Sequence, residues 1–291
     1  MLFLASSIPE TSTILKLHFT ATDEPQIEAI IKALEGGHEI TQNPDTLTSN
    51  VDALVVGPNS AEEDPDVKAA KKHSIPIFGI GDLLYKLAED KQRVVIAGSG
   101  DKAQIASIVI HVLQAVGKEF DYALWSTEHG SQVRLSSAPL IILEGSGEQN
   151  YYGDKRPQFL ALNHHIAQIT GLQHEFKDRY ALFDDYVQEF DKLADATPKG
   201  GTVLYCEDDD LVTVIGGKER ADVKSIPFSA HPGIADADGV AKLKTDSGEV
   251  MVKLSGEKTL DIIGAALALL KRLSVTEDQF YSAVKSYQPV Q

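Results

Sequence analysis

A short segment that contains two glycines, a serine and a lysine offers the clearest chemistry in the sequence. These residues are Gly98, Ser99, Gly100 and Lys102. They follow an apolar run at 94–97 and precede a stretch with helical periodicity at 102–116. A loop between a buried strand and a helix directs backbone N–H groups and a helix N-terminus at a phosphate. Glycine lets the backbone approach and lysine neutralises charge, so the segment is predicted to be a phosphate loop.

The same segment lacks one expected group and carries an unfavourable one. Ala103 follows Lys102, where a working loop has a Ser or Thr hydroxyl for magnesium. Asp101 adds a carboxylate, and a like charge about 4 Å from a phosphate costs roughly 4 kcal/mol at an effective dielectric of about 20, about a thousandfold in affinity. The structural alternative is a tight strand-to-helix turn with Asp101 as the helix N-cap.

The elements that would position this loop alternate between short apolar runs and helical patterns, which predicts an α/β fold with a mostly parallel sheet and crossover helices. Strands are expected at 15–19, 52–56, 75–78, 94–97, 140–143, 159–162 and 202–206. Helices are expected at 25–34, 65–73, 82–89, 102–116, 179–194, 259–273 and 276–286. A hairpin is expected between 240–243 and 250–254, with its turn at 246–249.

Length and composition limit the class of protein. At 291 residues the chain is expected to form two domains, divided after a charged stretch into 1–91 and 92–291. The net charge of −16 opposes binding to nucleic acid and to anionic lipid. Residues 1–5 are apolar but too short for a secretion signal, and no apolar run is long enough to span a membrane. With a single cysteine, Cys206, the chain has no internal disulfide, and a cytoplasmic location is expected.

Together with its neighbours, the loop identifies a resemblance to the Mur ligases, ATP-dependent enzymes that join amino acids or peptides to UDP-N-acetylmuramate in peptidoglycan synthesis. Residues 51–116 resemble the muramate–alanine ligase branch. Residues 153–159, 183–193 and 198–201 are similar to the branch that attaches murein tripeptide. The resemblance implies a Rossmann-like N-terminal domain and a P-loop-type central domain. It also implies ATP and magnesium as cofactors, and a UDP-muramate-type nucleotide or cell-wall enzymes as partners. The family's C-terminal domain is absent from the expected organisation, since the sequence stops at Gln291.

The departures from the family pattern fall where the family keeps its chemistry. Residues 20–25 bring two acids and a proline in place of a glycine-rich diphosphate turn. The element that contacts adenine in the family is replaced by 256–259, and Phe176 stands where the family has a metal-binding histidine. By resemblance, the remaining candidate magnesium ligands are Glu144, Glu148 and His174.

Three functions remain open from the sequence. The first is a catalytically inactive Mur-ligase-like protein with a binding or regulatory role. The second is an active ligase whose unusual site is completed by another domain or chain, with Lys102 on phosphate and the three candidate ligands on magnesium. The third is a small-molecule sensor that binds an anion in a cleft near Lys102. Three other features are expected to be structural: His164 and His165, the acidic run 207–210, and the thiol of Cys206.

Overall fold

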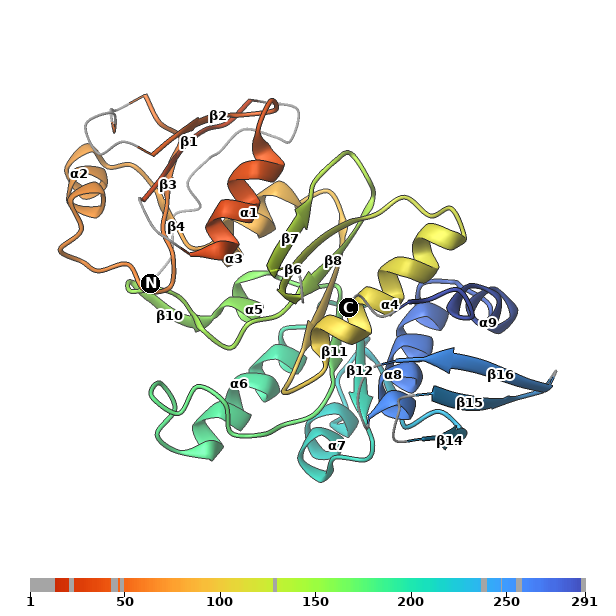
Figure 1. The fold of residues 1–291 in the computed structure, drawn as a ribbon. Coiled ribbons are helices and arrows are strands. Elements are labelled where there is room, and N and C mark those ends of the chain that lie inside the picture. Colours follow the sequence, from red (N-terminus) through yellow and green to blue (C-terminus); the bar gives the residue numbers. More distant parts are fainter. Residues whose placement is uncertain are drawn as a thin grey trace.

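The computed structural model describes residues 14–20, 24–42, 47, 50–127, 130–236, 240–246, 248–254 and 258–288. The apolar opening at 1–5 and residues 256 and 257 of the 256–259 element lie outside the described residues. Figure 1 shows two sheets side by side, each covered by helices, with a smaller sheet at the far end of the molecule. Within the described part of the chain, no helix is both long and apolar enough to cross a membrane.

The N-terminal sheet is parallel throughout, with the strand order β2-β1-β3-β4. Its strands are β1 Lys16–Phe19, β2 Glu39–Thr41, β3 Ala53–Val55 and β4 Ile77–Phe78. Its helices are α1 Pro25–Leu34, α2 Pro65–His73 and α3 Ile80–Leu87. α1 and α2 both begin at a proline, which suits the first helical turn because the N–H that proline lacks would have no partner there. α1 also packs against β7 of the central sheet.

The central sheet has the order β13-β12-β11-β5-β8-β6-β7, and all neighbours are parallel except β6 and β7. Its strands are β5 Gln92–Ala97, β6 Asp121–Thr127, β7 Gly130–Arg134, β8 Leu140–Glu144, β11 Ile166–Ile169, β12 Thr202–Cys206 and β13 Lys224–Phe228. β8 and β11 are buried along their whole length and β5 after its first residue, as expected for strands covered on both faces. The loop 98–101 therefore leaves the middle of the sheet.

Helices cover the two faces of the central sheet with separate apolar clusters. One face packs on α4 Lys102–Ala115, α8 Thr259–Arg272 and α9 Glu277–Val284. The other packs on α6 Phe183–Asp195 and α7 Asp210–Gly217, and its cluster continues into the N-terminal sheet. A hairpin of β9 Gln149–Tyr151 and β10 Asp154–Pro157, followed by α5 Gln158–Ala161, joins the two units. The small antiparallel sheet contains β14 Gly233–Ala235, β15 Val240–Thr245 and β16 Gly248–Lys253.

The predicted mostly parallel α/β fold is confirmed, and one element prediction is wrong. Residues 159–161 belong to helix α5 and Leu162 is its C-cap, so this segment is not a strand. A four-residue apolar run carries no usable periodicity, and here Pro157 directly precedes a helical turn that packs on α3. The elements that were not predicted are strands β2, β11, β13 and β14, the hairpins β6–β7 and β9–β10, and helix α7. The division into domains at residue 91 stays a prediction.

Candidate functional site

The loop after β5 is a tight turn that needs its glycines. Gly98 has φ 125° and Gly100 has φ 82°, values that side chains rarely allow. A Cβ on Gly98 would lie 2.5 Å from the Thr170 hydroxyl oxygen and 2.8 Å from the Gly171 carbonyl oxygen. The loop therefore packs directly against the segment that follows β11.

The polar groups that could hold a phosphate are engaged within the protein. The backbone N–H of Ser99 donates to the Gly171 carbonyl at 2.8 Å. The Ser99 hydroxyl donates to the Gln173 carbonyl at 3.0 Å and accepts from the Gln173 N–H at 2.8 Å. Lys102 Nζ turns back onto its own loop and donates to the Gly98 carbonyl at 2.5 Å. Each contact would have to break before a phosphate could take its place.

Glu175 brings a carboxylate to the same loop. Its Oε1 accepts from the Gly100 N–H at 3.4 Å, and its Oε2 lies 4.0 Å from Lys102 Nζ. A backbone N–H and an ammonium are the two donors that a phosphate loop offers to its ligand. The chain's own anion thus contacts both of them.

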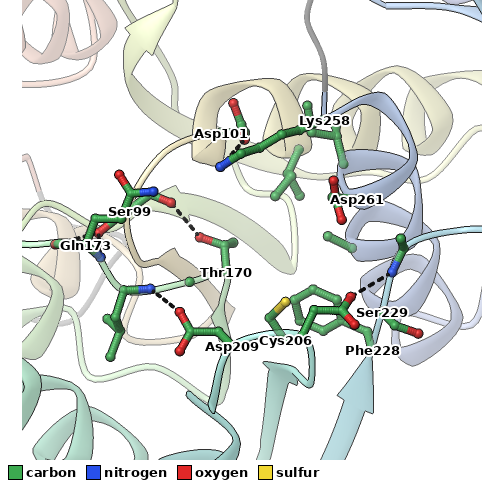
Figure 2. A pocket seen from close by; sticks show the side chains of 17 residues that line it. Ser99, Asp101, Thr170, Gln173, Cys206, Asp209, Phe228, Ser229, Lys258 and Asp261 are labelled. Carbon is green, nitrogen blue, oxygen red and sulfur yellow. Dashed lines mark hydrogen bonds and ion pairs between the residues drawn. The ribbon is translucent and has the colours of Figure 1, made fainter. Parts of the chain in front are cut away.

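An acidic pocket of about 240 Å³ opens beside the loop (Figure 2). Among its lining residues in the described part of the chain, four are aspartates, Asp101, Asp208, Asp209 and Asp261, and one is a lysine, Lys258. Burial raises the pKa of the Asp261 carboxyl, and the negative charge of Asp208 raises it further. The loop and this pocket fit a nucleoside triphosphate with magnesium poorly, because phosphates would meet carboxylates on several sides.

Asp101 and the acidic run have structural roles. Asp101 occupies the N-cap position of α4, as the structural alternative predicted, but its side chain makes no capping hydrogen bond and lies 3.9 Å from Lys258 Nζ. Asp209 caps α7 by accepting from the N–H groups of Leu211 and Val212, and its other oxygen accepts from the Leu172 N–H.

The three candidate magnesium ligands do not form one cluster. Glu144 is buried at the end of β8 and accepts from the Trp125 N–H at 2.8 Å. His174 bonds through Nε2 to the Tyr180 carbonyl at 2.7 Å, and Glu148 is held near Arg179. No group of three His, Cys, Asp or Glu side chains in the described residues could hold a metal ion. The family's usual magnesium set is therefore not assembled from these residues.

The N-terminal sheet also has a carboxylate where the resemblance implies a diphosphate turn. Glu24 lies just before α1, and its Oε1 is 3.4 Å from the Asn59 N–H. A Cβ on Gly57 would overlap the Glu24 carboxylate, so the two are in direct contact. Burial raises the pKa of Glu24. Residues 21–23 lie outside the described part of the chain.

A second pocket, which we call the crevice, lies between the two units. It measures about 430 Å³ and is lined by Pro58, Asn59, Glu148, Lys155, Phe176 and Arg179, among others. Arg179 donates through Nη2 to the Lys155 carbonyl, whereas its buried Nη1 has no hydrogen-bond partner among the described residues. Burial raises the pKa of the Glu148 carboxyl, and the Arg179 charge acts against that shift. The crevice therefore offers a guanidinium donor that an anion could accept from.

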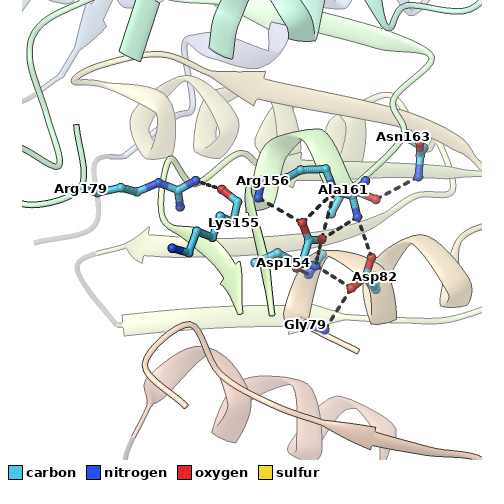
Figure 3. Close-up of polar contacts among 10 residues, drawn as sticks. Gly79, Asp82, Asp154, Lys155, Arg156, Ala161, Asn163 and Arg179 are labelled. Atoms are coloured by element: carbon cyan, nitrogen blue, oxygen red, sulfur yellow. Dashed lines mark hydrogen bonds and ion pairs between the residues drawn. The ribbon is translucent and has the colours of Figure 1, made fainter. Parts of the chain in front are cut away.

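A cluster of polar side chains ties the β9–β10 hairpin to helix α3 beside the crevice (Figure 3). Asn150 of β9 donates to Asp82 of α3 at 2.5 Å and to Asp154 of β10 at 3.0 Å, and it accepts from the Gly81 N–H at 3.1 Å. Arg156 forms a bidentate pair with Asp154 and lies 3.5 Å from Asp82. This cluster fixes the β9–β10 hairpin, and with it Lys155, against the N-terminal unit.

The remaining candidates are engaged inside the fold. His164 Nε2 contacts the Thr197 hydroxyl at 2.8 Å, and His165 Nδ1 accepts from the Arg93 N–H at 3.1 Å. Burial raises the pKa of the half-buried Cys206 thiol. Sequence reasoning missed Glu175 and Arg179. Both lie within or next to a segment singled out for its lost metal ligand, so proximity to that segment was the available signal.

Comparisons with known proteins agree with this architecture. No protein-family model matches the chain. The sequence is 25% identical over 252 residues to the UDP-N-acetylmuramate–L-alanine ligase of Solibacter usitatus, covering 82% of this chain and 52% of the relative. It is 23% identical over 253 residues to the enzyme of that name from Carboxydothermus hydrogenoformans, covering 81% and 52%. The chain thus spans about half the length of the curated relatives it matches.

Solved structures give the same result. The UDP-N-acetylmuramate:L-alanyl-γ-D-glutamyl-meso-diaminopimelate ligase from Neisseria meningitides has a TM-score of 0.80 at 17% identity, covering 96% of this chain and 100% of that one. The UDP-N-acetylmuramate–alanine ligase from Thermotoga maritima has a TM-score of 0.67 at 15% identity, covering 95% and 69%. The fold and these relatives define a ligase-type α/β protein. The chain belongs to the Mur ligase family and is related to the muramate and peptide ligases of peptidoglycan synthesis.

Proposed function

We propose that this Mur ligase family member does not catalyse ATP-dependent ligation and instead acts by binding a muramate-type ligand. The observation that carries the proposal is the contact of Glu175 with both donors of the phosphate loop, the Gly100 N–H and the Lys102 ammonium. A triphosphate would have to displace this carboxylate. The missing hydroxyl after Lys102 and the scattered candidate metal ligands support the same conclusion.

The crevice supports the binding role. Arg179 lines the crevice together with Lys155, and its buried Nη1 has no hydrogen-bond partner among the described residues. A buried hydrogen-bond donor without an acceptor destabilises the fold, and the carboxylate of a ligand would supply the acceptor. The Glu24 carboxylate at the start of α1 opposes a diphosphate in the N-terminal unit. We therefore expect recognition to depend on the lactyl carboxylate of a UDP-N-acetylmuramate-type molecule more than on its diphosphate.

The test is calorimetric titration with UDP-N-acetylmuramate, and in parallel with UDP-N-acetylglucosamine, which lacks the lactyl carboxylate. We expect saturable binding of the first and much weaker binding of the second. Arg179→Ala should weaken binding about tenfold, since a charge-assisted hydrogen bond is worth about 1.5–3 kcal/mol. Arg134→Ala, on an exposed position of β7, is the matched control. Equal binding of the two sugars, or no saturable heat from either, would refute this ligand.

The alternative is an active ligase whose site is completed by another domain or chain. The chain covers only 52% of the length of each of these two relatives, and this alternative assigns the remaining part of the site to another domain or chain. It predicts turnover of ATP when UDP-N-acetylmuramate and an amino acid are supplied, whereas the binding role predicts ligand binding with no turnover. A third reading, the small-molecule sensor, placed its anion near Lys102; the Glu175 contact argues against that location and the crevice offers another.

A further inference from the structure

β16 is an edge strand of the small antiparallel sheet. The sheet order is β14-β15-β16, so among the described residues β16 has a hydrogen-bonded neighbour on its β15 side only. Figure 1 shows this sheet at the end of the molecule remote from the N-terminal sheet. An edge strand presents backbone N–H and C=O groups that can pair with a further strand.

The side chains of β16 alternate in a simple pattern. Val250 and Val252 are 6% and 3% exposed and belong to the apolar cluster under α8. Glu249, Met251 and Lys253 lie on the opposite, exposed face, and the Met251 side chain is 52% exposed. The strand therefore carries an acid and a base at equal distances on either side of an exposed methionine.

This pattern is complementary to itself when two copies run antiparallel. We propose that β16 pairs with β16 of a second copy of this chain in a register centred on Met251. Met251 then lies opposite its counterpart, and Glu249 of each copy lies opposite Lys253 of the other, which gives two cross-strand ion pairs. Val250 lies opposite Val252 of the other copy, so the apolar inner face continues across the junction. The assembly is a two-fold symmetric dimer with a six-stranded sheet.

Other arrangements of the same two strands are less favourable. Parallel pairing in register places Glu249 beside Glu249 and Lys253 beside Lys253, which repel each other. A shift of the antiparallel register by two residues separates both ion pairs. The charges at the two ends of β16 thus select one orientation and one register.

The side chains next to Met251 on the exposed face of the small sheet are compatible with the proposed dimer. In the paired strands Ile234, Lys242 and Met251 form one row across the sheet, and Lys242 Nζ lies 2.6 Å from Glu249 Oε2. Ile234 is 66% exposed, so each Met251 lies in a row that is apolar at both ends. The whole chain carries a net charge of −16, which makes two copies repel at long range. At about 0.15 M salt the screening length is about 8 Å, so contacts within the strand pair act while the long-range repulsion is screened.

The test is sedimentation analysis of the full chain at about 0.15 M salt over a wide concentration range. We expect a reversible monomer–dimer equilibrium. Glu249→Lys and Lys253→Glu should each weaken dimerisation about tenfold or more, because each creates two like-charge pairs. The double variant Glu249→Lys/Lys253→Glu restores opposite charges across the junction and should return the dimer to near its original strength.

Controls separate this effect from misfolding and from net charge. Glu219→Lys changes the net charge as Glu249→Lys does, at an exposed position away from the small antiparallel sheet. It should leave the monomer–dimer equilibrium unchanged. Thermal unfolding followed by circular dichroism checks that each variant is folded. If a charge variant unfolds, Met251→Arg provides a second disruption, with like charges at the two-fold axis. A chain that stays monomeric at every concentration, or a dimer indifferent to these changes, overturns the proposal.

Discussion

Replacement of Glu175 by glutamine should convert the closed phosphate loop into one that accepts an anion. The Glu175 carboxylate lies 4.0 Å from Lys102 Nζ and contacts the Gly100 N–H. Glutamine keeps the size and the acceptor oxygen but removes the negative charge. At an effective dielectric of about 20, one unit charge at about 4 Å amounts to about 4 kcal/mol. The Glu175 side chain is 35% exposed, so solvent screening reduces this to about 1 kcal/mol, or about fivefold in affinity.

The assay is an NMR titration of the Gly100 amide with tripolyphosphate, which measures weak binding into the millimolar range. We expect the Gly100 signal to shift saturably in Glu175→Gln, with a dissociation constant about fivefold below that of the unmodified chain. Glu219→Gln, at an exposed position, should behave like the unmodified chain. Equal affinities in all three proteins would refute the idea that Glu175 excludes phosphate from this loop.

Two further predictions concern buried charge and stability. Burial lowers the pKa of His164 to about 4 from an ordinary 6.5. Between these two pH values His164 is protonated in the unfolded chain and neutral in the folded chain. The free energy of unfolding should therefore fall as the pH drops from about 6.5 towards 4. Urea unfolding should show this loss, up to about 3 kcal/mol, largely removed in His164→Gln; an unchanged pH slope in that variant would contradict it. Lys91 Nζ lies 3.2 Å from Asp121 and donates to the carbonyls of Ser136 and Ala138. Lys91→Met should cost about 3–5 kcal/mol, because the buried Asp121 carboxylate loses its counter-charge and keeps only its hydrogen bonds from Ser136. The double variant Lys91→Met/Asp121→Leu should recover much of that loss in the same assay, and an additive loss would show that the pair is not coupled.

Local patterns were sufficient for most of the fold. Helical spacing with Pro25 and Pro65 at the first turns predicted α1 and α2 at their observed bounds, and the apolar run before Gly98 predicted the central strand. Such patterns depend on neighbours within a few residues. Where the pattern was short it failed, as in the strand expected at 159–162, where residues 159–161 belong to helix α5. Helix α7 was missed although it begins in the acidic run 207–210, where Asp209 is its N-cap.

The chemistry of the site depended on contacts that no local pattern contains. Asp101 and Ala103 already indicated from the sequence that the loop is poorly suited to bind phosphate and magnesium. The carboxylate that contacts the loop is Glu175, which lies 75 residues from Gly100 along the chain. Arg179 likewise donates to the carbonyl of Lys155, 24 residues away along the chain, on the β9–β10 hairpin that Asn150 ties to α3. Sequence reasoning located the segments involved, and three-dimensional packing assigned their contacts.

The most direct test of the central proposal is phosphate release by the purified chain supplied with ATP, magnesium, UDP-N-acetylmuramate and L-alanine. Because Glu175 contacts the donors of the phosphate loop and no magnesium set is gathered among the described residues, we predict release no faster than in a sample without protein. Release that requires both UDP-N-acetylmuramate and L-alanine, and that is lost in Lys102→Ala, would contradict the proposal and establish an active ligase.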